Sequence, residues 1–251
     1  GANFVGQLAQ LTGADIAAST NDTGVSGDWV LEYQSGAVET NVVAATDYGF
    51  DLATIKVTNL NDSGAGSLRA AVTSATGNAA ADTIVFDPAL FASGAATLTL
   101  TSGALDVGGT SNSDAFTIIG PGENLLTISG NNTSRIFLAN TVNTSATSIS
   151  GMTLTNGSDA AQPNYGGGAI LSYYSGNLIL DHIIVKNSIA SNSGGGGAVG
   201  FGDNNGNLII SNSTFDSNSV TANGANGLGG GIAAFVTNGH SINISNSTIS
   251  N

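Results

Sequence analysis

A segment of about 30 residues is repeated along the C-terminal part of the chain, and this repeat restricts the fold more than any other feature. Its clearest copies begin at Leu178, Leu208 and Ile242, and a weaker copy begins at Thr147. Successive copies are offset by 31, 30 and 34 residues. Units this short cannot bury an apolar face alone, so neighbouring copies must stack on one another. The repeat therefore predicts a solenoid.

Apolar and polar residues alternate within each copy, which is the period of a β-strand and not of a helix. The segments are short, rich in Ile, Val, Thr and Phe, and bounded by Gly, Asn and Ser, as strands and turns require. When the copies are aligned, their apolar residues fall into three columns that we expect to be buried. The columns are Leu178, Leu208 and Ile242; Ile149, Leu180, Ile210 and Ile244; and Leu154, Val185, Phe215 and Ile249.

A further column predicts a bend in every copy. It contains Gly151, His182, Asn212 and Asn246. Gly tolerates a positive φ freely, and Asn and His adopt one more often than other residues. Three short strands per copy, separated by such bends, describe one coil of a right-handed parallel β-helix. We therefore expect an all-β fold of this kind, with an N-terminal α/β cap segment.

The composition restricts the partners of such a solenoid. Charged residues make up 8% of the 251 residues, and 17 acidic against 4 basic side chains give a net charge of −13. Nucleic-acid binding needs a Lys/Arg-rich surface, so no nucleic-acid partner is expected. No apolar run is long enough to span a bilayer, so no membrane insertion is expected either. The absence of Cys fits a secreted or cell-surface protein.

The first part of the chain does not share the repeat. Residues 1–50 are expected to be an N-terminal cap or the tail of a preceding domain, with a helix over residues 4–11 and a strand at Trp29–Tyr33. Residues 51–251 are expected to form the β-helix, with regular coils from about residue 147.

A cap helix is predicted near residues 67–76. Ser67 is a suitable N-cap residue, and Leu68 and Val72 mark an apolar face. Arg69 on this helix is expected to pair with a carboxylate such as Asp62 or Asp82. A helix at this place would cover the open first coil, whose backbone edge would otherwise template aggregation.

Two stretches of the second part resemble known surface proteins. Residues 57–59 and 62–72, the second reading DSGAGSLRAAV, resemble the N-terminal module of bacterial parallel β-helix surface proteins of the CSLREAI type. The leading Cys of that motif is Gly66 here and its Glu is Ala70. The repeats resemble those of chlamydial polymorphic membrane proteins and related adhesins. Gly167–Ile170 matches their Gly-Gly-Ala-Ile motif and Phe215–Asn218 matches their Phe-x-x-Asn motif.

A third resemblance concerns the first part. Residues 11–19 and 27–32 resemble the tail of an uncharacterised domain that precedes repeats in very large bacterial surface proteins. Together the three resemblances imply a secreted, cell-surface β-helix. They imply no reaction.

The residues offer little for catalysis. The basic side chains are Lys56, Arg69, Arg135 and Lys186, and the column that holds Asp181 contains no second acid to form a glycosidase pair. The two histidines, His182 and His240, have no Cys beside them and no zinc-site spacing. We therefore expect no catalytic residues and no cofactor. Calcium binding is left open without assigned ligands, with Asp22, Asp28 and Asp62 as candidate carboxylates.

A structural or adhesive function at the cell surface follows as the favoured hypothesis. The repeat is in full register at residues 242–249, so we expect either a longer natural chain or stacking of another molecule on the last coil. Stacking of copies would give head-to-tail association into an extracellular filament. Self-association or continuation of the chain is thus the expected partnership.

The alternative is an extracellular protein that binds or degrades polysaccharides, because parallel β-helices also include such enzymes. Tyr165, Tyr173 and Tyr174 flank one glycine-rich segment. Exposed aromatic rings in that place would stack on sugar rings. The position of these three side chains distinguishes the two hypotheses.

Overall fold

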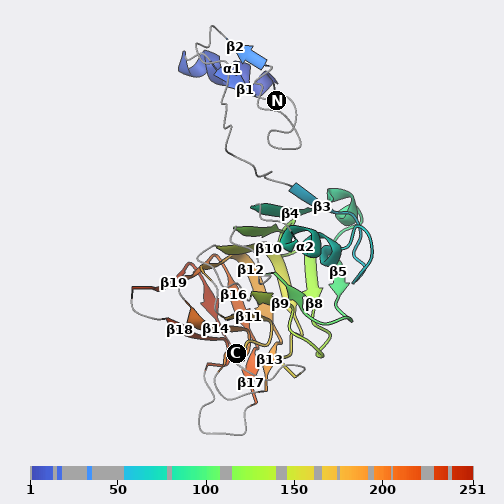
Figure 1. Cartoon of the computed structure of the whole chain (residues 1–251), viewed down its shortest axis with the longest axis vertical. Helices are drawn as coiled ribbons and strands as arrows, with labels where there is room; N and C mark the ends of the chain where they lie inside the picture. Colours follow the sequence, from blue (N-terminus) through green and yellow to red (C-terminus); the bar gives the residue numbers. More distant parts are fainter. Residues whose placement is uncertain are drawn as a thin grey trace. The chain divides into compact units, whose positions relative to one another are not determined.

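The protein is described by a computed structural model that covers two compact units, Gly1–Leu52 and Ala53–Asn251. The described residues are 2–13, 16–18, 33–35, 54–77, 81–107, 115–139, 146–160, 166–173, 176–191, 195–204, 206–221, 229–236 and 239–250. Figure 1 labels the elements of both units along the sequence.

The first unit contains a helix and two short strands. Helix α1 spans Ala2–Thr12 and ends where Gly13 takes a φ of 67° and donates its N–H to the Ala9 carbonyl. Strands β1 (Ile16–Ala18) and β2 (Tyr33–Ser35) pair antiparallel. The helix predicted over residues 4–11 is therefore present. The strand predicted at Trp29–Tyr33 lies outside the described residues except for Tyr33, which begins β2.

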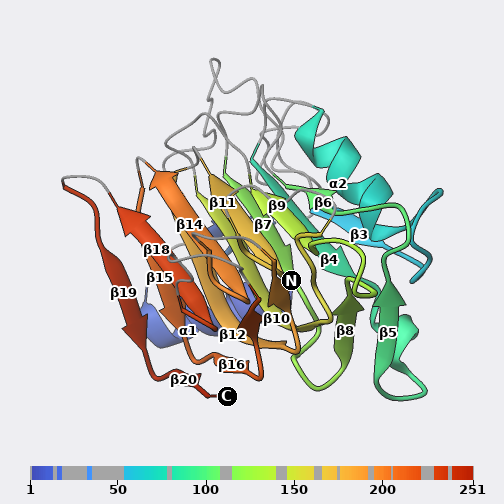
Figure 2. The ribbon, with the colours of Figure 1, turned by 90° about the horizontal axis from the view of Figure 1, so that it is seen from below.

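The second unit is a parallel β-helix, and its strands stack side by side in rows (Figure 2). The first row contains β3 (Thr54–Val57), β4 (Asp82–Phe86), β7 (Phe116–Ile119), β10 (Thr147–Thr155), β12 (Leu178–Lys186), β15 (Leu208–Ser211) and β19 (Ile242–Ser245). The second row contains β5 (Ala96–Thr99), β8 (Leu126–Ser129), the second halves of β10 and β12, β16 (Thr214–Asp216) and β20 (Thr248–Ile249).

A third row closes each coil. It contains β6 (Leu105–Asp106), β9 (Phe137–Ala139), β11 (Ile170–Tyr173), β14 (Val199–Asn204) and β18 (Ile232–Val236). A short extra pair, β13 (Ile189–Ala190) with β17 (Ser219–Val220), is also parallel. Helix α2 (Leu68–Thr76) and the 3-10 helix η1 (Pro88–Phe91) interrupt the early coils.

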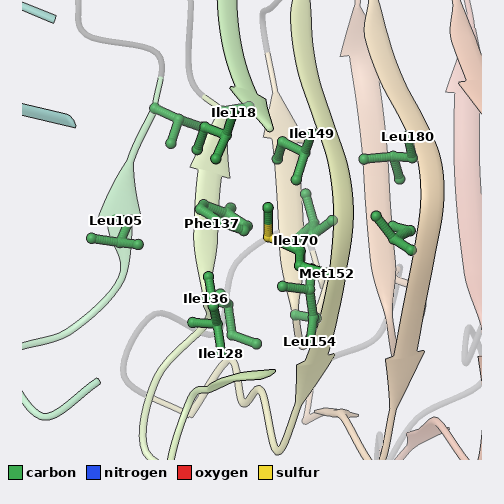
Figure 3. Packing of buried hydrophobic residues seen from close by; sticks show 14 of the residues in the cluster. Leu105, Ile118, Ile128, Ile136, Phe137, Ile149, Met152, Leu154, Ile170 and Leu180 are labelled. Atoms are coloured by element: carbon green, nitrogen blue, oxygen red, sulfur yellow. The ribbon is translucent and has the colours of Figure 1, made fainter. Parts of the chain in front are cut away.

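Residues of successive repeats lie directly above one another. Leu178 pairs in register with Leu208, which pairs with Ile242. The inner columns are closed to solvent through most of the stack, and Figure 3 shows side chains of successive coils packed together in this interior. Column residues with no exposed surface are Ile149, Leu154, Leu178, Leu180, Val185, Leu208, Ile210 and Phe215.

The last described coil departs from the expected burial. Ile242, Ile244 and Ile249 keep the register of their columns but are 42%, 41% and 52% exposed. Alignment of the repeats predicted the correct column for each of them. It did not predict their exposure, which arises because no further described coil lies on β19 and β20.

The predicted bend column is confirmed. Gly151, His182, Asn212 and Asn246 have φ values of 67°, 49°, 50° and 48°. In β10 and β12 this residue lies inside one continuous strand. The residues before it pair in the first row and the residues after it pair in the second row. A second bend column was not predicted: Asn156, Asn187 and Ser217 also have positive φ.

The glycine-rich segments bring backbones of neighbouring coils into close contact. A Cβ on Gly168 would meet the Gly197 carbonyl oxygen, and a Cβ on Gly197 would meet that of Gly230. The coils therefore approach too closely here for any side chain. This contact explains why the glycines recur with the repeat.

Column burial can be tested by comparing two members of one column. Leu208→Ala should lower the free energy of unfolding by about 2–5 kcal/mol, because it leaves a cavity in a closed core. Ile242→Ala in the last described coil should cost about 1 kcal/mol or less, because its side chain is already half solvated. Denaturant titration of both variants measures the difference, and equal costs would contradict the column assignment.

The bend column can be tested at Asn212. Asn212→Gly should retain a melting temperature near that of the wild type, because Gly adopts the φ of 50° freely. Asn212→Val should lower it, because a β-branched residue is strained in this region. Thermal unfolding followed by circular dichroism compares the two, and matching melting temperatures would remove this explanation of the bend.

Candidate functional site

Helix α2 covers the first coil as predicted from the sequence. The Ser67 side chain accepts a hydrogen bond from the Ala70 N–H at 3.2 Å, as an N-cap residue does. Leu68 and Val72 are buried, and the helix contacts β3, β4 and β6. The apolar interior is thus closed at this end by a helix with a polar outer surface.

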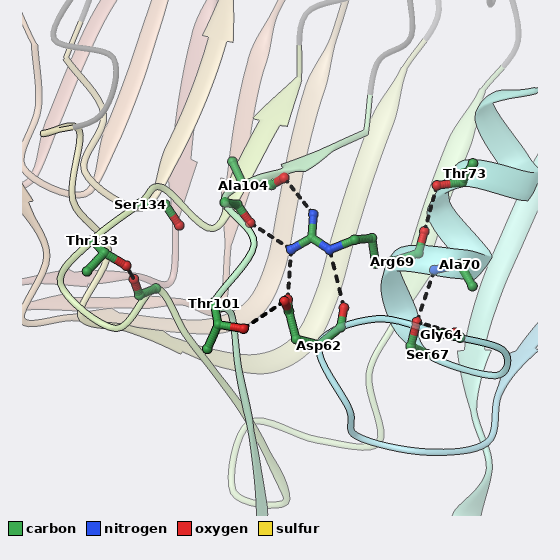
Figure 4. A network of polar contacts seen from close by, with 12 residues as sticks. Asp62, Gly64, Ser67, Arg69, Ala70, Thr73, Thr101, Ala104, Thr133 and Ser134 are labelled. Atoms are coloured by element: carbon green, nitrogen blue, oxygen red, sulfur yellow. Dashed lines mark hydrogen bonds and ion pairs between the residues drawn. The ribbon is translucent and has the colours of Figure 1, made fainter.

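Arg69 attaches this helix to a neighbouring loop (Figure 4). Its Nη2 donates to the Asp62 carboxylate at 2.8 Å and to the Gly103 carbonyl at 2.7 Å. Its Nη1 donates to the Ala104 carbonyl at 3.0 Å, and its Nε to the Asp62 carbonyl at 3.2 Å. The partner predicted as Asp62 or Asp82 is therefore Asp62. Since the guanidinium is held by four hydrogen bonds within the protein, its role here is structural.

The environment of Asp62 controls its ionisation. Burial alone would raise its pKa, but hydrogen bonds from Arg69, Ser102 and Thr101, together with the Arg69 charge, lower the pKa from 3.8 to about 2. The ionised carboxylate is thus favoured by folding. The stability it contributes is present above about pH 4 and is lost as the pH falls towards 2.

An acid titration tests this contribution. Between pH 4 and pH 2, the free energy of unfolding should fall less steeply with pH in Asp62→Asn than in the wild type, because the carboxylate with the lowered pKa is gone. The change in slope should correspond to about one proton. Arg69→Gln should also make this slope less steep, because it removes the guanidinium that lowers the pKa of Asp62. Denaturant titrations across this range measure the slope, and an unchanged slope in Asp62→Asn would contradict the assignment.

A second charged pair lies inside the β-helix. Arg135 and Asp159 are 3% and 0% exposed, with 4.0 Å between Nη2 and Oδ2. The Arg135 guanidinium donates to the carbonyls of Gly166 and Gly167 at about 2.9 Å. Burial lowers the pKa of Arg135, and the Asp159 charge opposes that change. Asp159 in turn accepts hydrogen bonds of 2.6 Å from the Ser191 N–H and hydroxyl.

This buried pair was not predicted. Arg135 was recognised from the sequence only as one of four basic residues, and Asp159 was not singled out. A weak signal was present, because Arg135 precedes the glycine-rich segment at 166–168 by roughly one repeat. The pair is almost fully buried and joins three successive levels of the stack, so it acts as a structural connection.

Asp181 is the centre of an exposed polar cluster. It accepts hydrogen bonds from the Ser211 hydroxyl at 2.6 Å and the Asn212 amide at 2.9 Å, and its other oxygen lies 2.7 Å from His182 Nδ1. The Ser211 bond, with help from His182 and Asn212 and against partial burial, lowers the pKa of Asp181 to about 2. Hydrogen bonding and charge from Asp181 raise the pKa of His182.

This cluster does not form a nucleophilic triad. In a triad the serine hydroxyl is bonded to the imidazole, which takes its proton. Here the Ser211 hydroxyl donates to the carboxylate, and His182 bonds the same carboxylate from the other side. The arrangement instead ties Asp181 of one coil to Ser211 and Asn212 of the next.

Other polar residues of the repeats make the same kind of connection. The Asn177 side-chain oxygen accepts from the Asn207 N–H, and the Asn207 oxygen accepts from the Ser241 N–H, both at 2.8 Å. The Ser188 N–H donates to the Asn218 side chain, and the Asp216 carboxylate accepts from the Ser250 hydroxyl. Polar side chains therefore form ladders along the axis of the solenoid.

The proposed tyrosine cluster is largely outside the described structure. Tyr165 and Tyr174 lie outside the described residues. Tyr173 ends β11 and is partly buried, with its ring about a van der Waals distance from the place where a Cβ of Gly202 would lie. The one described tyrosine of the three is therefore not fully presented to solvent.

One depression on the β-helix is apolar. It has a volume of about 470 Å³ and is lined by Val85, Phe86, Pro88, Phe91, Ile119, Gly120, Pro121 and Leu125. No acid, base or hydroxyl belongs to this lining. It therefore offers shape and apolar contact but no group that could take part in a reaction.

Potential metal ligands are dispersed among the described residues. These residues contain no group of three or more His, Cys, Asp or Glu side chains placed to hold a metal ion. Of the carboxylates considered for calcium, Asp62 is bound by Arg69, and Asp22 and Asp28 lie outside the described residues. No described helix is long and apolar enough to cross a membrane.

Comparison with known families gives one match. Residues 1–50 match a domain of unknown function, DUF4347. The match covers the part that lacks the repeat and leaves the β-helix outside it. No curated protein matches the chain.

Proposed function

We propose that the chain is a structural segment of a secreted bacterial cell-surface protein, in which the β-helix serves as a stalk or adhesive scaffold. The observation that carries the proposal is the use of the polar residues. Polar side chains form hydrogen bonds to residues of an adjacent coil, as Asp181, Asn207 and Asp216 do. They thus add to the apolar contacts by which the buried columns hold the coils together. Side chains that could have faced a ligand hold the coils together instead.

The surface location is supported by the sequence. The chain has no Cys, which fits a secreted or cell-surface protein. Residues 62–72 and the Gly167–Ile170 motif resemble bacterial surface β-helices. Residues 11–19 and 27–32 resemble the tail of a domain that precedes repeats in very large surface proteins. These resemblances all favour the same location.

The cap helix favours a stalk over a head-to-tail filament. A filament would require the last coil of one copy to stack on an open first coil of the next. Helix α2 lies over that first coil and buries Leu68 and Val72 against it. The polar outer surface of α2 offers no columns on which a second solenoid could continue.

Two measurements test the structural function. Immunogold labelling of intact source cells should place the protein at the cell surface, and labelling confined to the cytosol would contradict the proposal. A glycan array should give no selective binding. Strong binding that is abolished by Tyr173→Ala or Tyr174→Ala, but retained in the control Tyr33→Ala of the first unit, would instead establish the polysaccharide-binding alternative.

A further inference from the structure

The apolar depression lies at the corner where two early coils pass from the first row to the second. In the coil of β4 the chain leaves the ladder at Asp87 and forms η1. In the coil of β7 it leaves the ladder at Gly120 and returns to it at Leu126. Strands β10 and β12 make the same passage without an interruption. Two extra segments of chain therefore build the depression.

The depression combines buried aromatic rings with exposed aliphatic side chains. Phe86 and Phe91 are almost fully buried, and their rings pack edge to face with 6.4 Å between the centroids. Ile119 and Leu125 belong to the same lining but are 45% and 37% exposed. Large apolar side chains that stay exposed around a preformed depression indicate a surface that binds a partner.

The size of the depression favours a small molecule over a protein as this partner. Its volume of about 470 Å³ falls within the range of ligand pockets, which is about 300–1,000 Å³. A specific protein interface takes about 20–30 residues on each side, whereas eight residues line the depression. The lining contains no polar side chain, so the part of the ligand that lies in it must be apolar.

A basic side chain lies at one edge of the depression. Lys56 of β3 pairs in register with Val85 of β4, which belongs to the lining, so both side chains lie on the same outer face of the sheet. Lys56 is exposed and makes no hydrogen bond or ion pair with another described residue. The other Lys and Arg side chains each have an acidic neighbour within the protein: Arg69, Arg135 and Lys186.

The acids closest in sequence to the lining are engaged in other contacts. The Asp87 carboxylate accepts a backbone N–H of η1 at 2.9 Å. Asp181 raises the pKa of His182 and the charge of Glu123 adds to this effect, so Glu123 acts on the Asp181 cluster. The net charge of −13 opposes an anion at long range, but physiological salt screens charges beyond about 8 Å. Lys56 therefore supplies the local charge for an anionic group.

We propose that the depression binds one molecule of a free anionic amphiphile, with its hydrocarbon chain on Phe86, Ile119 and Leu125 and its carboxylate beside the Lys56 ammonium. The hydrocarbon chain leaves water as it covers the exposed side chains. The long stem of Lys56 lies along apolar surface and carries its charge to the carboxylate. This inference goes beyond the structural function and does not rest on it, because ligand binding and surface labelling are measured independently.

The first experiment is a calorimetric titration of the whole chain with three amphiphiles of equal chain length. Decanoate should bind one-to-one and saturably, below the concentration at which it forms micelles. Decanol, which keeps the chain and lacks the charge, should bind about fivefold more weakly. Decyltrimethylammonium should bind more weakly still, because its charge is repelled by Lys56.

Two pairs of variants test the assigned contacts. Ile119→Ser should weaken decanoate binding by about tenfold, because it removes apolar surface from the lining. The control Ile189→Ser changes a side chain of similar exposure on β13, outside the depression, and should bind as the wild type does. Lys56→Gln should weaken binding of decanoate by about fivefold and leave that of decanol unchanged. The control Lys186→Gln should change neither.

The second experiment locates the ligand on the wild-type chain. In methyl nuclear magnetic resonance spectra, decanoate should shift the signals of Ile119 and Leu125 and leave those of Ile189 in place. This measurement does not depend on the folding of any variant. Circular dichroism of each variant checks that the β-helix has formed.

Four results would overturn the proposal. The first is a wild type that shows no saturable binding of decanoate. The second is a cation that binds as tightly as decanoate, which would remove the role of Lys56. The third is decanoate binding that survives Ile119→Ser or shifts no methyl signal of the lining. The fourth is sedimentation of the chain with phosphatidylglycerol vesicles without binding of free decanoate, which would assign the depression to a lipid surface.

Discussion

The structure depends on in-register parallel stacking of coils that are nearly identical in residue pattern. Each coil presents apolar side chains inward at the same positions, so burial of one coil is completed only by its neighbours. Leu178, Leu208 and Ile242 illustrate this directly: the first two are closed to solvent, and the third is not. Burial in this fold is a property of the position in the stack and not of the residue alone.

This dependence explains what the sequence could predict. The pairing of Leu178 with Leu208 and Ile242 and the positive φ of His182 and Asn212 follow from local chemistry repeated at a fixed period. The N-cap role of Ser67 follows from the local sequence around one helix. Repetition makes such signals stronger than they would be in a single strand or helix.

The features that were missed lack that periodic signal. The Arg135–Asp159 pair is not repeated from coil to coil, so no column of aligned residues marks it. The second bend was hidden because Ser217 occupies a position held by Asn in the preceding coils. Exposure of Ile244 could not be read from its residue type, because its burial depends on a neighbouring layer.

The single buried Arg135 has a consequence for folding fidelity. Because the coils have similar sequences, a coil could pair with the wrong neighbour during folding. In a pairing shifted by one whole repeat, Leu would still lie on Ile and Asn on Asn. Such a slip would separate the guanidinium from the carbonyls of Gly166 and Gly167 and leave an ion in a dry interior, at a cost of several kcal/mol. This one unrepeated set of contacts thereby distinguishes the correct stacking of the coils from a stacking shifted by one repeat.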